Sequence, residues 1–289
     1  MRRIALTVTC LLTVWVAGAA AQVKSDVVVE RGRTATTADT YCAGMISNEE
    51  VPNDLYVISG LEADPQTVWS LGQYIYLSKG SADGVKIGDE FMITRPVKDF
   101  LHVKVYDEEH SLANGMGTQW EDIGRVRVAV VQPKVSIAQI SYSCSYMQRG
   151  DYARPAVEFP IPPFKPLKDL DKFAPPSGKS EGRVVRAKNY LAAQDRGQVV
   201  YVNLTGVKPG DYIRFFRHPA PQDHAIYQIG GMSDHVFGFG QTPSHWGPED
   251  LPREILGEGV VLRTTPTSAS VLIFNELREI YLGDYAEIE

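Results

Sequence analysis

The segments Gly72-Gln73-Tyr74-Ile75-Tyr76 and Gly197-Gln198-Val199-Val200-Tyr201 repeat one short pattern at a spacing of 125 residues. A second pair follows them, Gly84-Val85-Lys86-Ile87-Gly88-Asp89 and Gly206-Val207-Lys208-Pro209-Gly210-Asp211, at a spacing of 122. Two matches at nearly the same spacing indicate that one half of the chain is a copy of the other.

The similarity continues toward the end of each copy, where the spacing is 133 residues. It relates Glu121 to Glu254 and Gly150-Asp151 to Gly283-Asp284. A spacing that stays constant over about 30 residues is typical of a tandem duplication. We therefore expect one module at residues 41–155 and a second at residues 182–289.

Each copy has the composition of short strands. Its Val-, Ile-, Tyr- and Thr-rich stretches are bounded by Gly, Pro and Asp, which favours strands joined by tight turns. Helix signals are nearly absent, and only residues 64–71 and 190–195 have the pattern of a helical turn or two. The sequence predicts an all-β protein made of two tandem small β-barrels or sandwiches.

The shared Gly-Asp pairs occur where a turn leads into a strand. Glycine there supplies a positive φ, and the carboxylate accepts hydrogen bonds from local backbone N–H groups. Asp89, Asp151, Asp211 and Asp284 all occupy such corners. A catalytic role for these four aspartates is the alternative, but the repetition in both copies favours a structural role.

The N-terminus has the pattern of a secretory signal peptide. Arg2 and Arg3 precede an apolar run from Ile4 to Val16, and three alanines end at position 21, so we expect cleavage after residues 1–21 and an extension over residues 22–40. The remaining chain has 27 Lys and Arg against 35 Asp and Glu. This negative balance argues against a nucleic-acid partner, and no transmembrane segment is expected in the mature chain.

Cys42 and Cys144 are the two cysteines outside the expected signal peptide. In an oxidising compartment two thiols are most simply one disulfide, so we predict that they are joined. Two separate buried thiols are the alternative, because spacing alone cannot show that the residues meet.

Residues 156–181 have the composition of a linker. Together with Pro155 they contain seven prolines, a density that removes strand hydrogen-bond donors and favours an extended chain. Aromatic side chains between the prolines suggest that this linker packs along a module, although a partner's groove would accept the same pattern.

The two copies diverge between Arg95 and Glu121 and between Arg217 and Glu254, so we expect specificity to lie in these inserts. Aromatic residues in them fit either a packed lid or a stacking surface for a sugar or peptide; the candidate binding residues are Trp120, Tyr227, Phe237, Phe239 and Trp246.

The second insert also carries four histidines, the residue type that binds zinc, but their spacing matches no compact ligand motif: His218, His224, His235 and His245. We expect no bound metal and no cofactor, and a solvated acidic run at residues 107–109.

Motifs of enzymes are missing or out of context. Residues 178–182 read G-x-S-x-G, but prolines precede the serine and a strand-like stretch follows it, whereas a nucleophile elbow needs a strand and then a helix. No phosphate-binding loop, dinucleotide fingerprint or H-E-x-x-H motif occurs in the sequence. We therefore predict that the protein is not an enzyme.

Residues 72–91, read with Gln132–Ala138 and Gly150-Asp151, resemble a family of uncharacterised exported bacterial envelope proteins, some of which carry a lysin-motif domain that binds peptidoglycan. The same pattern is similar to the C-terminal domain of the flagellar assembly protein T group, a small β-barrel of the periplasmic flagellar ring. The resemblance implies tandem β-barrels in the periplasm or cell envelope and offers no catalytic residue.

The function expected from these features is a non-catalytic, exported module for interaction or assembly in the cell envelope, with an envelope protein or a peptidoglycan-related molecule as partner. The alternative is a protein that binds carbohydrate or a peptidoglycan fragment through its aromatic inserts. A metal-dependent hydrolase, using the histidines, is a more distant third.

Overall fold

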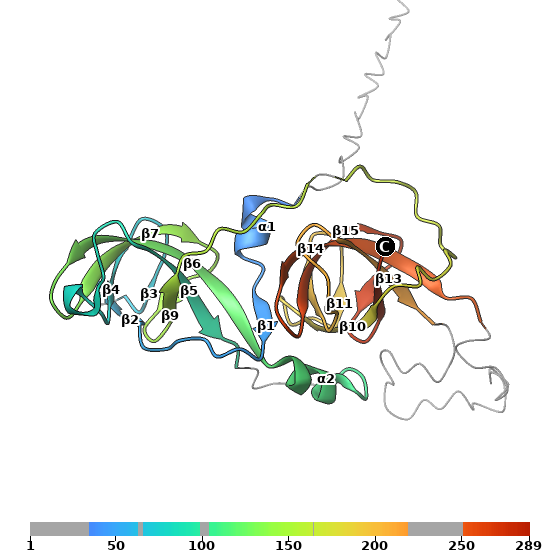
Figure 1. Ribbon diagram of the computed structural model, residues 1–289, viewed down its shortest axis with the longest axis horizontal. Coiled ribbons are helices and arrows are strands. Elements are labelled where there is room, and N and C mark those ends of the chain that lie inside the picture. The colour runs from blue at the N-terminus through green and yellow to red at the C-terminus, as the bar shows by residue number, and fades with distance from the viewer. Residues whose placement is uncertain (1–34, 63–65, 99–103, 164, 219–250) are drawn as a thin grey trace, which may run out of the picture. The chain divides into compact units, whose positions relative to one another are not determined.

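The computed structural model describes residues 35–62, 66–98, 104–163, 165–218 and 251–289 (Figure 1). Strands dominate the described chain, and the described residues all belong to one compact unit. The all-β class and the two tandem modules are confirmed. Among the described residues, no helix is both long and apolar enough to cross a membrane.

Module 1 is a curled antiparallel sheet. Its strand order is β2 (Val57–Gly60), β4 (Tyr74–Leu77), β7 (Ser136–Ser143), β6 (Thr118–Val131), β5 (Glu90–Pro96) and β9 (Tyr152–Pro155). A further strand, β1 (Met45–Ser47), pairs with the start of β6. Two short strands, β3 (Val68–Trp69) and β8 (Met147–Gln148), form a separate pair, and the 3-10 turn η1 covers Ser81–Asp83.

Module 2 is a closed barrel with the corresponding strands in the same order. They are β10 (Glu181–Ala187), β12 (Val199–Val202), β15 (Ala269–Glu276), β14 (Glu254–Thr264), β13 (Tyr212–Arg217) and β17 (Tyr285–Ile288). The short pair β11 (Ala193–Gln194) and β16 (Ile280–Tyr281) corresponds to β3 and β8. One strand order in both modules is what a tandem duplication produces.

The closing seam differs in length between the modules. In module 2, β10 pairs with β17 over three residue pairs. In module 1, β2 and β9 meet only in the bridge between Tyr56 and Tyr152, with backbone hydrogen bonds joining Val57 to Asp151 and Ala153 to Leu55. Each module encloses its own apolar core, with Ile75, Ile93 and Ile140 fully buried in module 1.

The prediction of helical turns at residues 64–71 and 190–195 is wrong for the part of these ranges that the structure describes, residues 66–71 and 190–195. The structure has strands there, β3 and β11, and the buried side chains Trp69 and Gln194 point inward from them. These short strands pair with β8 and β16, which supplies the backbone partners that a helix would otherwise provide.

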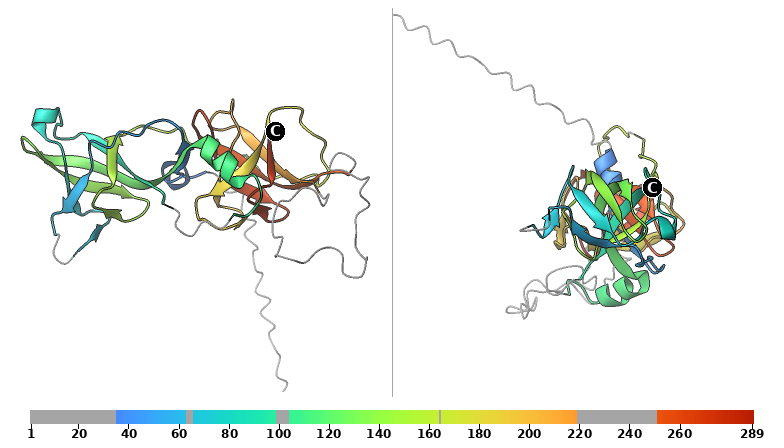
Figure 2. Two further views of the ribbon diagram at one scale, coloured as in Figure 1. Left: turned by 90° about the horizontal axis from the view of Figure 1, so that it is seen from below. Right: turned by 90° about the vertical axis from the view of Figure 1, so that its left-hand side faces the viewer.

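Two helices occur instead where the sequence shows no periodic pattern. Helix α1 (Thr37–Tyr41) begins with a reciprocal cap, in which the Thr36 hydroxyl accepts from the Asp39 N–H and the Asp39 carboxylate accepts from the Thr36 N–H. Helix α2 (Glu109–Met116) lies in the first insert and contacts β10 of module 2 (Figure 2). Both helices are held by packing on module 2, which short helices need in water.

The proline-rich linker is packed, as expected from its aromatic residues. The Tyr212 hydroxyl donates to the Pro163 carbonyl, and the Lys165 ammonium lies 3.5 Å from the Glu258 carboxylate. Ala174 is buried against Phe216 and Ile255 of module 2. The linker therefore follows the outside of module 2.

Candidate binding surfaces

The four turn aspartates have the structural role predicted for them. Asp89 and Asp211 each accept a hydrogen bond from the backbone N–H three residues earlier, at 2.8 and 2.9 Å. Asp151 and Asp284 each form a two-bond ion pair with an arginine of the neighbouring strand, Arg95 and Arg217 respectively. Their carboxylates are therefore occupied by the same contacts in both modules.

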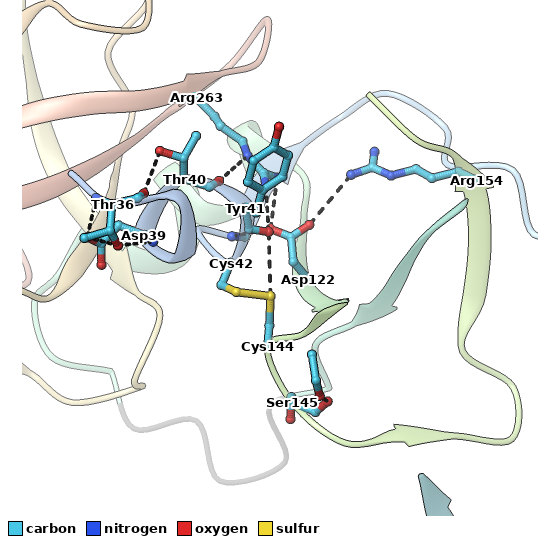
Figure 3. Close-up of a disulfide and its surroundings, with 12 residues drawn as sticks. Thr36, Asp39, Thr40, Tyr41, Cys42, Asp122, Cys144, Ser145, Arg154 and Arg263 are labelled. Carbon is cyan, nitrogen blue, oxygen red and sulfur yellow. Dashed lines mark hydrogen bonds and ion pairs between the residues drawn. A yellow bond between two sulfur atoms is a disulfide. The ribbon is translucent and has the colours of Figure 1, made fainter. Parts of the chain in front are cut away.

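Cys42 and Cys144 are joined, which confirms the predicted disulfide (Figure 3). Their Cα atoms lie 5.5 Å apart across 102 residues of sequence. Cys42 ends α1, and Cys144 follows β7, where its N–H donates to the Ile123 carbonyl. The bond thus fastens the segment containing α1 to module 1.

Trp120 does not have the exposed ring that a sugar-stacking role requires. It is only 8% exposed, because β1 and β5 flank it at Met45 and Pro96 and its ring packs 5.9 Å from the ring of Tyr152. This burial gives no support to the candidate binding role of Trp120. It is part of the structural contact between β1 and module 1.

The remaining candidates of the second insert lie outside the described residues, with one exception. These are Tyr227, Phe237, Phe239, Trp246, His224, His235 and His245. His218 is described, and its ring packs edge-on against Phe216 and Tyr285 at 5.6 and 5.2 Å. Within the described ranges, no group of three or more His, Cys, Asp or Glu side chains could hold a metal ion.

The first insert is a packed element of module 2. Tyr106 is 4% exposed and belongs to the core of module 2, where it lies against Gly283. Glu109 is fully buried, 2.6 Å from the Arg186 guanidinium, and its carboxylate also accepts from the Val105 N–H. The expectation of a solvated acidic run is therefore wrong for Glu109, whose charge is neutralised at the barrel end. Burial raises the pKa of the Tyr106 hydroxyl.

One outer face of module 2 is covered by residues 35–47, which contain α1 and β1 and which we name the strap. The covered face, the module 2 wall, consists of Val185, Val199, Tyr201, Arg263 and Ser270, each at most 6% exposed. Ala35, Ala43 and Ile46 of the strap and Met116 of α2 pack on its apolar members. The predicted N-terminal extension thus contributes residues 35–40 to this cover.

Polar side chains of the module 2 wall bind the backbone of the strap. The hydroxyls of Tyr201 and Ser270 donate to the carbonyls of Ala43 and Gly44, both at 2.9 Å. Arg263 donates to the carbonyls of Thr40 and Tyr41 and pairs with Asp122 at 2.9 Å. Burial raises the pKa of Tyr201 far above its usual range, so this hydroxyl stays a donor.

The corresponding face of module 1, the module 1 wall, has no such cover among the described residues. Strand register relates Val185, Val199, Tyr201, Arg263 and Ser270 to Ile58, Tyr74, Tyr76, Val130 and Ile137. The same bulge occurs at Ile58 and at Val185, which secures the correspondence. Ile58 is 39%, Tyr74 37% and Val130 45% exposed, and Tyr76 and Ile137 are half-buried.

Sequence reasoning placed the candidate binding residues in the inserts and missed this wall. A signal was available in Tyr74-Ile75-Tyr76-Leu77, which is apolar at every position although one face of a small barrel normally points to water. Such a strand is expected to be covered on both faces. In module 2 the strap and α2 cover the outer face of the corresponding strand, β12. In module 1 no described residue covers the outer face of β4 in this way.

No protein-family model matches the chain, and no curated protein matches it.

Proposed function

We propose that this chain is a non-catalytic interaction module of the cell envelope that holds a partner protein on the module 1 wall. The observation that carries the proposal is the exposure of Ile58, Tyr74 and Val130, whose counterparts in module 2 are buried under the strap. Clustered apolar side chains on a soluble surface mark interaction sites.

The side chains of the module 1 wall indicate what kind of partner it binds. Arg263 and Ser270, which bind the strap's carbonyls in module 2, correspond to Val130 and Ile137 in module 1. The module 1 wall has thus exchanged donors for apolar side chains. We infer that its occupant is an envelope protein segment that presents apolar side chains, rather than an extended backbone held by hydrogen bonds.

Export and a non-catalytic role belong to the same proposal. A disulfide that spans 102 residues persists in an oxidising compartment, and the N-terminal sequence has the pattern of a signal peptide. The acidic corners repeated in both modules supply no reactive carboxylate, because backbone N–H groups and arginines occupy them. A periplasmic or envelope location follows as part of the proposal.

Site-specific photocrosslinking in the producing cell tests this function. A photoreactive phenylalanine analogue replaces Tyr74 on the wall or, as control, Ile87, which is 72% exposed in the turn before β5 and is not a wall residue. We expect a crosslink to one envelope protein from position 74 and none from position 87. A product that contains only this chain would show a self-interface and contradict the proposal.

A pair of variants links that crosslink to the wall. The double change Ile58→Asp and Tyr76→Asp should abolish the crosslink from position 74, because each lost apolar anchor costs about 2 kcal/mol of binding. Ile87→Asp should leave it intact. If the double variant retains the crosslink with an unchanged melting temperature, the wall is not the docking surface.

A further inference from the structure

A second site lies at one end of module 1, in a cavity of about 750 Å³. It opens between the end of β5, the start of β6 and the turn from β8 to β9, and Tyr190 of module 2 completes its lining. This volume lies within the range of small-molecule sites, which bury most of a ligand against apolar surface and orient it with a few polar groups.

The arginine in this cavity is committed to the fold. Nε and Nη2 of Arg95 donate to the two oxygens of Asp151 at 2.7 and 2.8 Å, and Nη2 also donates to the Tyr146 carbonyl at 2.9 Å. The same pair occurs in module 2 as Arg217 and Asp284. The Arg95 and Asp151 charges therefore cancel in place and form a rigid wall of the cavity.

Glu121 is an acidic group of the cavity that has no partner in the described part of the chain. Its side chain is half-buried and makes no hydrogen bond or ion pair with any described residue. Burial raises the pKa of Glu121, against the charges of Arg95 and Lys188, which lower it. A carboxylate removed from water without a donor is costly, so a ligand that donates hydrogen bonds gains by binding here.

Two tyrosine rings provide the apolar surface. Tyr152 lies on β9, half-buried beside Trp120, and Tyr190 follows β10, where it is 56% exposed. Tyr190 has a φ of 61°, and no other described residue except glycine has a positive φ. A bulky residue in this conformation is strained, and such strain is found preferentially at ligand sites.

We infer that this cavity binds a saccharide. A sugar presents C–H faces that pack on tyrosine rings and hydroxyls that donate to Glu121 while accepting from Gln148 or from Lys98 at the cavity lining. Asp151 neutralises Arg95 and Glu121 repels anions, but Lys98 and Arg149 also line the cavity, so inorganic phosphate is included in the test as a competitor. The site is separate from the module 1 wall and does not depend on the function proposed for that wall.

Calorimetric titration of the mature protein tests the inference, with chitotriose, maltotriose and cellotriose as probes. We expect at least one of the three to bind with one site per chain. Glu121→Ala removes the acceptor, and Tyr190→Gly removes a ring while suiting the positive φ. Each change should weaken binding at least tenfold, and Leu191→Ala, an exposed neighbour that does not line the cavity, should leave it unchanged.

The readouts separate a ligand role from a structural one. Thermal melts should show all three variants folded, and saccharide affinity should fall as pH falls through the raised pKa of Glu121, because the protonated group has lost its charge as an acceptor. The inference is overturned if none of the trisaccharides binds, if binding survives both cavity variants, or if inorganic phosphate competes with the sugar for the site.

Discussion

The walls of the two modules are built from corresponding strands but differ in burial. The module 2 wall is covered by the strap, and the module 1 wall is exposed. Tyr201 of module 2 is 1% exposed beneath the strap, whereas its counterpart Tyr76 lies on a face with Tyr74 at 37% exposure. The difference does not come from the strands, whose order and register agree. It comes from residues 35–47 and α2, which cover only one copy. Duplication thus supplied two equivalent faces, and the added segments buried one of them.

The largest expected effect is a difference in the stability lost when each of these two tyrosines is replaced by alanine. Tyr201→Ala should destabilise the protein by about 4 kcal/mol, because it empties a closed site and leaves the Ala43 carbonyl without its donor. Tyr76→Ala should cost less than about 1 kcal/mol, since a half-exposed side chain loses little buried area. Guanidinium melts of both variants measure the difference. Equal losses would mean that the Tyr76 wall is also covered.

The disulfide gives the next effect. Replacing Cys42 and Cys144 by serine should lower the free energy of unfolding by about 3 kcal/mol, because a loop of 102 residues gains freedom in the unfolded chain. The loss should loosen the strap first, so hydrogen exchange at residues 40–47 should rise more than exchange within β7. An unchanged exchange rate in the strap would show that module 2 alone holds it.

The modules should also differ in how their stability depends on pH, because an ion pair at β17 of module 2 has no counterpart in module 1. Buried Arg253 pairs with buried Glu287 at 2.6 Å, and the corresponding module 1 residues are Trp120 and Arg154. Burial raises the pKa of Glu287, but the hydrogen bonds from Arg253 and from the Ser177 N–H outweigh it and hold that pKa below the usual range. Stability from this pair is therefore present above the unfolded pKa and is lost as pH falls through the folded one.

Arg253→Met should accordingly cost about 2 to 3 kcal/mol at pH 7, because it leaves a buried carboxylate with fewer partners, and clearly less at pH 3, where Glu287 takes up a proton. Urea melts at both pH values measure this. Arg127→Met in module 1, which removes an exposed arginine 4.0 Å from the exposed Glu90, serves as the control. A cost for Arg253→Met that does not change with pH would exclude the pair as its source.

The smallest effect should be the same in both modules. Asp151→Asn and Asp284→Asn each break one repeated ion pair whose carboxylate is at most 1% exposed. We expect each to cost about 2 kcal/mol and the two costs to agree within about 0.5 kcal/mol, because arginine and backbone contacts match in both copies. Thermal melts test this, and a large disagreement would mean that the two corners differ in function.

Local patterns allowed most of the fold to be predicted, and long-range packing set the limit. The duplication, the strands and the structural role of Asp89 and Asp211 follow from turn chemistry within a few residues. The strap does not, because β1 has only three residues and the wall residue Tyr201 lies 158 residues from Ala43, the strap residue that it binds. The burial of Trp120 was not predicted for the same reason, since a tryptophan in a divergent insert gives no sign of the strand that covers it.

The site was harder to predict than the fold. Glu121 was recognised as a position shared with Glu254, and nothing in the sequence shows that its carboxylate lacks a partner among the residues that the structure describes. Tyr190 was read as the start of a helical turn, whereas its positive φ depends on the geometry of the loop. Burial and backbone strain are properties of the folded chain and leave no simple residue pattern.

The placement of the strap also sets an order of events for the growing chain. Synthesis proceeds from the N-terminus, so Ala43 is made well before Tyr201, whose hydroxyl it accepts across 158 residues of sequence. Contacts of such separation form slowly, because a long loop must close first. Module 1 can fold early, and the disulfide can hold the strap on module 1 until module 2 has been synthesised. The strap is therefore among the first segments to be made and among the last to be buried.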